Sequence, residues 1–271
     1  MLGTEWPAEE AAALASAILR EYTGMGMAAQ LAFGERVPDA GAAARIEDAA
    51  VRAAAGEPLQ YIFGYTEFCG HRIEVQPGVL IPRPETEEMT MMIIRGNAGF
   101  TGAVTDLCTG SGCIAVALSL AFPGASLTAT DFSDAALAVA RRNVGLTGAA
   151  VSLRKSDILT DEPSAVPLSD IIVSNPPYVT MREKAAMHRN VLDHEPHEAL
   201  FVPDDDPLLY YRAIAAVAET RLMPGGTVWL EVNENLAKDT AALFYGPLYR
   251  KVQVIQDIRG KERFVKSEKH G

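Results

Sequence analysis

Hydrophobic residues in the first sixty positions recur at helical spacing within an alanine-rich background. Leu14 and Ile18 share one face of a first helix, and Ile46 and Val51 mark a second amphipathic stretch, where we expect both to face inward. Prolines and glycines stand at the ends of these stretches, as is common at helix boundaries. The sequence therefore predicts a small helical bundle, with helices between Pro7 and Gly24, over residues 39–55 and over residues 59–63.

The hydrophobic pattern changes after Gly64, where the residues are spaced as in strands. Gly70 and the pair Pro77-Gly78 are typical turn residues between those strands. The hydrophobic positions are Phe68, Ile73, Val75, Val79 and Ile81. We therefore expect three parts: an N-terminal helical domain at 1–64, a β-hairpin linker at 65–82 and a larger domain at 83–271.

Short hydrophobic strands alternate with helical patterns throughout the larger domain. The expected strands lie at residues 103–108, 126–130, 151–154, 170–174, 226–232, 251–257 and 262–266. The expected helices lie at about residues 85–95, 112–122, 133–147, 207–222 and 234–245. Alternating β and α elements followed by a final pair of strands predict an α/β fold with a doubly wound, mostly parallel sheet of seven strands.

Composition narrows the class of protein. Of 271 residues, 48% are hydrophobic, which is enough for a core without disulfides or a metal. The net charge of -11 and the scattered basic residues argue against a dedicated nucleic-acid binder, which usually carries a basic stripe. Three cysteines without C-x-x-C spacing indicate free thiols. With no basic signal segment at the start and no apolar run of about 20 residues, we expect a cytoplasmic protein that does not enter a membrane.

A glycine-containing loop follows the first strand of the predicted sheet and leads into a helix. Glycine is favoured where the backbone turns sharply and approaches a ligand closely, and open α/β sheets bind ligands at this position. The loop also fits the dinucleotide pattern G-x-G-x-x-A, so by itself it indicates an adenosine-containing cofactor without identifying it. Its candidate cofactor-binding residues are Cys108, Thr109, Gly110, Ser111 and Gly112.

Acidic residues follow the next two predicted strands. Asp131 has the spacing of a carboxylate that binds ribose hydroxyls, although an aspartate there can also cap the next helix. Asp157 is placed to meet an adenine amino group, and a solvated turn is the alternative. Together with Asp106, these acids suit a sulfonium cation better than a pyrophosphate. The sequence therefore favours S-adenosylmethionine over NAD.

The segment Asn175-Pro176-Pro177-Tyr178 lies directly behind a buried strand. Proline fixes the backbone and removes its N–H donor, which leaves carbonyls free to accept hydrogen bonds. Asn175 adds a side-chain oxygen and Tyr178 an aromatic face, so the four residues are suited to bind a planar group that carries an NH2. A proline-rich turn without a ligand is the alternative interpretation.

These motifs together resemble the class I methyltransferases that alkylate amino nitrogens, and other segments resemble the HemK/PrmC family. The matching segments are residues 56–64 (GEPLQYIFG), 80–87 (LIPRPETE), 195–200 (EPHEAL) and 257–263 (DIRGKER). The resemblance covers nearly the whole chain. It implies methyl transfer from S-adenosylmethionine to the N5 nitrogen of the Gly-Gly-Gln glutamine in class I peptide-chain release factors.

The resemblance also implies roles for individual residues. The Asn175 side-chain oxygen and the Pro176 carbonyl are the expected acceptors for the substrate NH2, Tyr178 is expected to stack on the amide, and Pro177 completes that substrate site. Asp131, Asp157, Ile158 and Asn175 are expected to contact the cofactor together with the glycine loop. The sequence departs from the family at Cys108, where glycine is usual, and at Ile158, where an aromatic residue is common.

Several alternatives remain open at this point. Arg83, Glu85 and Glu87 fit either substrate contact or a structural ion pair joining the two domains, and we expect no metal at His194 and His197. The N-terminal bundle is either a docking surface for the release factor or only a stabilising domain, and we expect a monomer. The rival functions are a nucleic-acid amino-group methyltransferase, a nicotinamide oxidoreductase and a non-catalytic nucleoside-binding protein.

Overall fold

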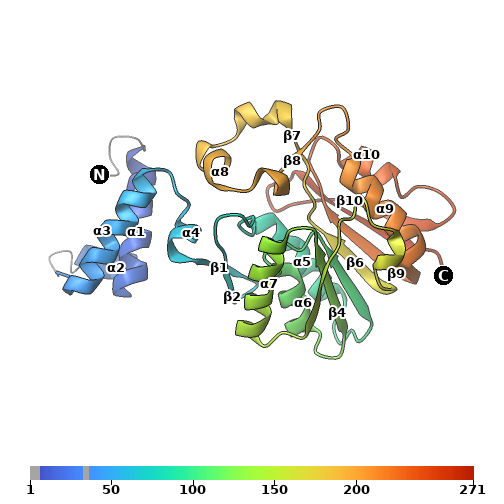
Figure 1. Cartoon of the computed structure of the whole chain (residues 1–271), viewed down its shortest axis with the longest axis horizontal. Coiled ribbons are helices and arrows are strands. Elements are labelled where there is room, and N and C mark those ends of the chain that lie inside the picture. Colours follow the sequence, from blue (N-terminus) through green and yellow to red (C-terminus); the bar gives the residue numbers. More distant parts are fainter. Residues whose placement is uncertain (1–6, 33–36) are drawn as a thin grey trace. The chain divides into compact units, whose positions relative to one another are not determined.

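The computed structural model describes residues 7–32 and 37–271, which fall into two compact units (Figure 1). Unit 1 contains the described residues up to Tyr65 together with His188–His194. Unit 2 contains Thr66–Met187 and Glu195–Gly271. The segment between Met187 and Glu195 therefore leaves unit 2 and returns to it.

Unit 1 is helical. Its helices are α1 (Ala8–Thr23), α2 (Met27–Ala32), α3 (Ala40–Ala54), α4 (Leu59–Phe63) and α8 (Arg189–His194). Helix α1 ends at Gly24, whose φ of 69° is accessible to glycine at little cost. Helix α3 begins at Asp39, whose side chain accepts a hydrogen bond of 2.8 Å from the Ala42 N–H. The sequence pattern anticipated α1, α3 and α4 but neither α2 nor α8.

The core of unit 1 is small and rich in alanine. Ile18 packs there with Ala49, Ala53 and Ile62. The prediction that Val51 faces inward is wrong, because 49% of its surface is exposed. On α3, Ala49, Ala53 and Ile46 belong to the core cluster while the larger Val51 is exposed, so residue size alone misidentified the buried face.

Unit 2 is built on a single large sheet. Within the described residues, seven strands form it in the order β10-β11-β9-β6-β3-β4-β5. The pairs β3–β4, β4–β5, β3–β6 and β6–β9 are parallel, and β11 is antiparallel to both of its neighbours. The strands are β3 (Ala103–Leu107), β4 (Ser126–Asp131), β5 (Val151–Lys155), β6 (Ser169–Ser174), β9 (Leu222–Glu231), β10 (Tyr249–Gln256) and β11 (Glu262–Lys269). The predicted seven-stranded, mostly parallel sheet is confirmed.

Helices cover both faces of this sheet (Figure 1). Successive residues of a strand point to opposite faces, so Ile171 and Val173 join one core while Ile172 joins the other. The first core includes α5 (Pro84–Gly96) and α6 (Cys113–Ala121), with α7 (Asp134–Thr147) beside them. The second core includes α9 (Leu209–Arg221) and α10 (Ala237–Ala242).

Helix α10 is shorter than the predicted segment of residues 234–245. The Asn233 side-chain oxygen accepts a hydrogen bond of 2.9 Å from the Asn235 N–H, and the Leu236 N–H donates to the Asn233 carbonyl. This tighter turn precedes the helix, in which the Thr240 N–H donates a hydrogen bond of 2.8 Å to the Leu236 carbonyl.

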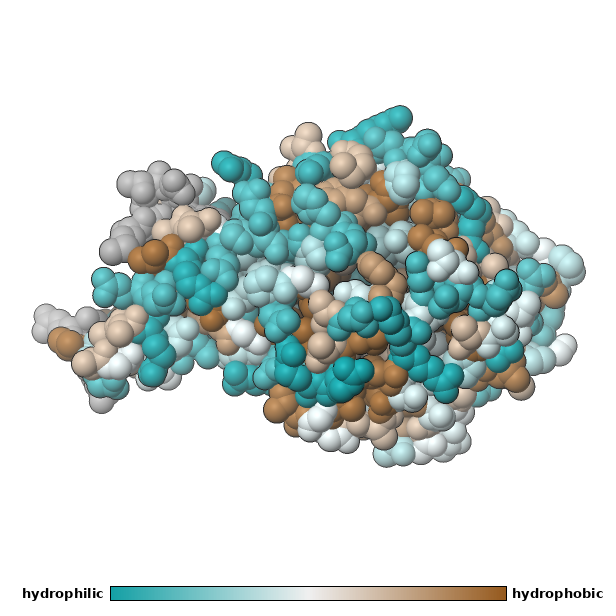
Figure 2. Space-filling view, in the orientation of Figure 1, coloured by the Kyte–Doolittle hydropathy of each residue, from teal (hydrophilic) through white to brown (hydrophobic). Residues whose placement is uncertain are grey.

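Two short strand pairs complete unit 2. The hairpin strands are β1 (Tyr65–Phe68), of which Tyr65 is assigned to unit 1, and β2 (His71–Glu74). The second pair, β7 (Val179–Thr180) and β8 (Phe201–Val202), is parallel and was not anticipated from the sequence. On the face seen in Figure 2, hydrophobic residues form separate groups among hydrophilic ones. Every helix in the described part of the chain is too short or too polar to cross a membrane.

Candidate active site

The predicted glycine loop and the Asn-Pro-Pro-Tyr segment meet beside β3, where the order of the strands in the sheet reverses. Strand β3 lies between β4 and β6, and Leu107, the last residue of β3, pairs with Ser174, the last residue of β6. The Ser174 hydroxyl donates a hydrogen bond of 2.7 Å to the Leu107 carbonyl. Cys108 and Asn175 therefore leave the sheet side by side, at the position where open α/β sheets bind ligands.

A cavity of about 900 Å³, counting the space at its mouth, lies at this edge of unit 2. Of the predicted site residues, it is lined by Cys108, Thr109, Gly110, Ser111, Asp131, Asp157, Ile158, Asn175 and Pro177. Gly112, Pro176 and Tyr178 are not among the lining residues. The sequence did not anticipate the contribution of Val79, Leu80, Pro82, Thr86, Phe132, Glu198 and Tyr210.

Three left-handed residues shape the glycine loop, with φ of 59° at Cys108, 56° at Gly110 and 81° at Gly112. A Cβ added at Gly110 would meet open space, whereas one at Gly112 would lie 3.1 Å from the Cβ of Ala140. Gly112 therefore allows the start of α6 to approach α7 closely. Its glycine requirement comes from helix packing as well as from backbone conformation.

Cys108 has a backbone conformation that favours glycine, so its side chain is expected to lower the stability of the folded protein. We expect Cys108→Gly to raise the free energy of unfolding by about 1 kcal/mol, because the left-handed conformation is strained for a residue with a Cβ. Urea unfolding of the two proteins measures the difference. Unchanged or lower stability would show that packing of the Cys108 thiol outweighs the backbone strain.

Asp131 holds the loop from the neighbouring strand. Its carboxylate accepts hydrogen bonds of 2.8 Å from the Gly110 N–H and 2.9 Å from the Ser133 N–H. Ser133, not Asp131, is the N-cap of α7, since its hydroxyl accepts from the Ala136 N–H. Burial raises the pKa of Asp131, and the backbone donors oppose that shift. Asp131 thus lies in the cavity wall and fixes the position of Gly110.

Asp106 lies directly beneath the loop and is fully buried. It accepts a hydrogen bond of 2.5 Å from the Thr109 hydroxyl. Burial raises the pKa of Asp106 to about 7, although the hydrogen bond from Thr109 opposes the shift. Asp106 does not line the cavity, so its direct contribution is to the conformation of the loop.

The raised pKa of Asp106 predicts a pH dependence of stability. In the unfolded chain this carboxyl titrates near 3.8 and in the folded protein near 7, so folding binds a proton between these values. The wild type should therefore lose stability relative to Asp106→Asn as the pH rises from about 4 to about 7, by an amount on the order of 1 kcal/mol or more. Urea unfolding of both proteins across that range tests this, and parallel curves would contradict it.

Apolar and aromatic side chains also line the cavity. Phe132 follows Asp131 directly, lines the cavity and is 43% exposed. Ile158 and Tyr210 also line it. The Asp157 side chain accepts a hydrogen bond of 3.0 Å from the Leu159 N–H. A flat aromatic ring beside an acidic group is a suitable surface for a nucleobase.

The charge of the cavity favours a cation. Its ionisable acids are Asp131, Asp157 and Glu198, and no lysine, arginine or histidine lines it among the described residues. A dinucleotide would bring a pyrophosphate next to carboxylates, with no basic side chain to balance it. A sulfonium ion beside the same carboxylates is attracted, so the residues present fit S-adenosylmethionine better than NAD. In the described part of the chain, no cluster of three or more metal-binding side chains could hold a metal ion.

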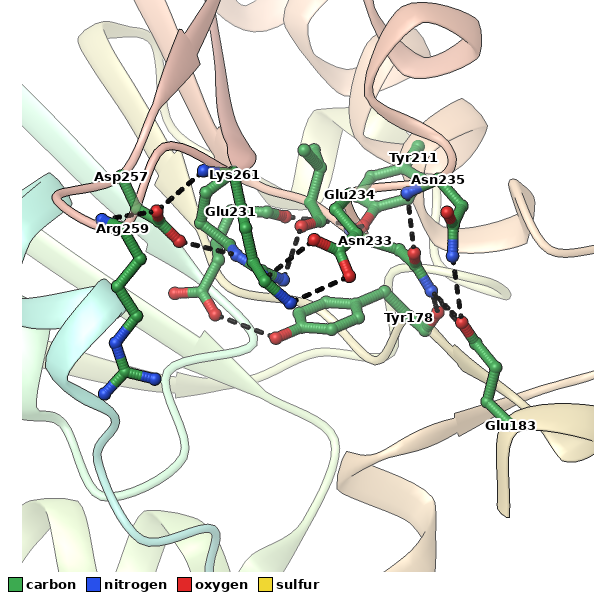
Figure 3. A network of polar contacts seen from close by, with 12 residues as sticks. Tyr178, Glu183, Tyr211, Glu231, Asn233, Glu234, Asn235, Asp257, Arg259 and Lys261 are labelled. Carbon is green, nitrogen blue, oxygen red and sulfur yellow. Dashed lines mark hydrogen bonds and ion pairs between the residues drawn. The ribbon is translucent and has the colours of Figure 1, made fainter. Parts of the chain in front are cut away.

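Asn175 belongs to a chain of hydrogen bonds that leads away from the cavity. Its amide nitrogen donates a hydrogen bond of 2.9 Å to the Thr86 hydroxyl, and that hydroxyl donates one of 2.6 Å to Glu231. The Tyr178 phenol donates 2.9 Å to the other oxygen of Glu231 (Figure 3). Burial raises the pKa of Glu231, and the hydrogen bonds from Thr86 and Tyr178 oppose that shift. Burial also raises the pKa of the phenol, and the charge of Glu231 adds to this effect.

The Arg-Pro-Glu-Thr-Glu segment is also held by ion pairs and hydrogen bonds. Arg83 pairs with the buried Glu195 at 2.7 Å, and Glu195 also accepts from the Ile81 N–H. Glu87 accepts a hydrogen bond of 2.7 Å from the Cys69 N–H. Of the two roles left open for Arg83, an ion pair is present, but it lies within unit 2 and does not join the two units. The pair instead connects two segments that line the cavity.

Solved structures define the class of fold. A methyltransferase from Pyrococcus furiosus aligns with a TM-score of 0.53 at 20% identity, over 84% of this chain and 98% of that one. The ribosomal protein L11 methylase of Lactobacillus delbrueckii aligns with a TM-score of 0.51 at 20% identity, over 73% and 86% of the two chains. The chain therefore has a class I methyltransferase-type fold.

Sequence comparison identifies the family within that class. Residues 7–64 match the PrmC N-terminal domain and residues 88–199 match the methyltransferase small domain. A release factor glutamine methyltransferase of Bacteroides thetaiotaomicron is 46% identical, over 81% of this chain and 79% of that protein. The one of Cereibacter sphaeroides is 42% identical, over 83% and 79%. The chain belongs to the HemK/PrmC family of release factor glutamine methyltransferases.

Proposed function

We propose that this protein transfers a methyl group from S-adenosylmethionine to the N5 nitrogen of the glutamine in the Gly-Gly-Gln motif of class I peptide-chain release factors. Family membership supports the reaction. The observation that carries the proposal is the position of Asn175, which lines an acidic cavity next to the glycine loop.

The residues at the ends of β3, β4 and β5 would hold the cofactor. Asp131 would accept hydrogen bonds from the ribose hydroxyls, while Asp157 and Ile158 would contact the adenine. The backbone at Gly110 can approach a ligand closely because open space lies where a side chain would stand. S-adenosylmethionine supplies an electrophilic methyl group when bound.

Asn175 would orient the nitrogen that is methylated. A carboxamide nitrogen is a weak nucleophile because its lone pair is delocalised into the carbonyl. If the Asn175 side-chain oxygen and the Pro176 carbonyl accept the two N–H groups, the nitrogen is held in place. As the N–C bond forms and the methyl–sulfur bond breaks, positive charge that develops on the nitrogen strengthens both hydrogen bonds, so the pair stabilises the transition state more than the bound substrate. The nitrogen then loses one of its two protons to water, which gives the neutral N-methyl amide.

We also propose a role for Tyr178 and for the N-terminal domain. In the structure the phenol of Tyr178 donates a hydrogen bond to Glu231, so its hydroxyl is occupied, and packing of its ring against the substrate amide would need a contact beyond the residues that line the cavity. Residues 1–64 would provide the docking surface for the release factor. Because release factors act on cytoplasmic ribosomes, we place the reaction in the cytoplasm.

A transfer assay with two classes of acceptor tests the proposed function. The protein is incubated with radiolabelled S-adenosylmethionine and either a class I release factor or a mixture of DNA and RNA. We expect label in the release factor and none in the nucleic acid. Label in the nucleic acid alone would assign the protein to the amino-group methyltransferases of bases instead.

A further inference from the structure

We propose that Thr86 and Glu231 are positioning residues that fix the amide of Asn175 with its nitrogen toward α5 and its oxygen free for the substrate. This inference rests on the proposed function. Both residues are buried, with 2% of Thr86 and 1% of Glu231 exposed. They are 145 positions apart in the sequence, and their side chains meet at 2.6 Å.

The orientation of the Asn175 amide follows from the number of protons available. A threonine hydroxyl has one proton, and that of Thr86 is given to Glu231. The Thr86 oxygen can therefore only accept from Asn175, and of the two ends of the amide only the nitrogen donates. A carboxylate at Glu231 thus selects one of the two amide orientations of Asn175, which would otherwise be nearly equal in shape.

Glu231 is held as an acceptor by its surroundings. One carboxylate oxygen accepts from Thr86 and the other from the Tyr178 phenol. Arg263 is the neighbouring positive charge that favours the ionised form. The Arg263 Nε also donates a hydrogen bond of 3.5 Å to the Asp257 carboxylate. A protonated Glu231 could donate to the Tyr178 phenol and would still accept from Thr86 with its other oxygen, so the selection at Thr86 holds in either protonation state.

The same network fixes the backbone of the Asn-Pro-Pro-Tyr segment (Figure 3). The Asn233 amide nitrogen donates hydrogen bonds of 3.3 Å to the Tyr178 carbonyl and 3.0 Å to the Glu183 carboxylate. The Tyr178 N–H donates 3.2 Å to the Leu200 carbonyl. Tyr178 is therefore held at its phenol and at both backbone groups, so the amide of Asn175 is the part of the segment whose orientation depends on Thr86.

Loss of the Thr86 hydroxyl would remove this selection. The amide of Asn175 could then turn its nitrogen toward the cavity, where it would face the substrate nitrogen donor to donor. That arrangement cannot hold the substrate NH2, so a fraction of bound complexes becomes unproductive. The expected effect is on kcat and not on binding of the cofactor.

The test compares Thr86→Val with a matched variant, Thr90→Val, one turn further along α5. Thr90 is also fully buried and also has a hydroxyl that donates a hydrogen bond, in its case to the Thr86 carbonyl. Steady-state methylation of a release factor is measured for both. We expect Thr86→Val to lower kcat about tenfold to a hundredfold with less than threefold change in the KM for S-adenosylmethionine, and Thr90→Val to leave kcat within about threefold.

Two further variants separate positioning from a general structural effect. Thr86→Ser keeps the hydroxyl and should restore kcat to within about threefold of the wild type. In an Asn175→Ala background, Thr86→Val should change kcat by less than about threefold, because the group that it positions is gone. If Thr86→Val does not fold, Thr86→Ala takes its place in every comparison.

The inference is overturned if Thr86→Val retains wild-type kcat, if Thr86→Ser is as impaired as Thr86→Val, or if the effect persists fully without Asn175. These outcomes are distinct from failure of the proposed function. In that case the wild-type protein itself would not methylate the release factor, and the same variants would be compared on whichever acceptor is labelled.

Discussion

Asn175→Ala should lower kcat for release factor methylation about 100- to 1,000-fold while the Kd for S-adenosylmethionine changes less than about threefold. The side-chain oxygen of Asn175 is the expected acceptor for the substrate NH2, and a hydrogen bond that strengthens in the transition state contributes to rate more than to binding. The magnitude follows from the usual effect of removing one group that stabilises developing charge. Steady-state methylation of a release factor and calorimetric titration with S-adenosylmethionine measure the two quantities.

Asn97→Ala is the matched control for this prediction. Asn97 follows the C-terminal end of α5, and its amide nitrogen donates 2.8 Å to the Ile93 carbonyl, so the chemical change is the same at a site that does not line the cavity. We expect its kcat to stay near the wild-type value. Equal losses in both variants, or an unchanged kcat in Asn175→Ala, would contradict the assigned role of Asn175.

Asp131→Ala should weaken binding of S-adenosylmethionine about tenfold to a hundredfold. The carboxylate would contact the ribose hydroxyls, and it also holds the Gly110 N–H at 2.8 Å. Hydrogen bonds to a charged group contribute about 1.5–3 kcal/mol, which corresponds to this range of affinity. Calorimetric titration with S-adenosylmethionine measures the change.

Asp134→Ala is the control for the cofactor site. Asp134 lies three residues further on, its side chain is 80% exposed, and it pairs with Lys155 at 2.5 Å. Exposed ion pairs contribute little to stability, and Asp134 does not line the cavity, so cofactor affinity should not change. A wild-type Kd in Asp131→Ala would mean that the cofactor does not use this carboxylate.

The architecture of unit 2 was predictable because its strands are short and buried on both faces. Runs such as Ile171-Ile172-Val173 have little alternative to the interior of a parallel sheet, where each face receives alternate residues. The strand pair β7–β8 and helix α8 were missed because they are short and lack a hydrophobic period. Each of the two strands has two residues, and the helix has six. Their position depends on distant contacts, such as that of the Tyr178 N–H with the Leu200 carbonyl.

The site was predictable in its motifs and not in the contacts between them. Gly110, Asp131 and Asn175 follow strand ends, so their convergence is a consequence of the fold. The link from Asn175 to Thr86 spans 89 positions, and no local pattern indicates it. The same holds for Asn143, which is fully buried and donates hydrogen bonds of 3.0 Å to the Glu74 carbonyl and 2.8 Å to the Ser111 carbonyl. Such pairings become visible only when the tertiary structure is known.

In the proposed reaction, Asn175 presents a glutamine side chain for methylation. Tandem mass spectrometry of the Gly-Gly-Gln peptide tests it most directly, after a release factor has been incubated with S-adenosylmethionine and either the wild-type protein or Asn175→Ala. We predict the mass of one added methyl group on the glutamine side chain with the wild type, and an unmodified peptide with the variant over the same time. A methyl group on another residue, or equal modification by both proteins, would contradict the account.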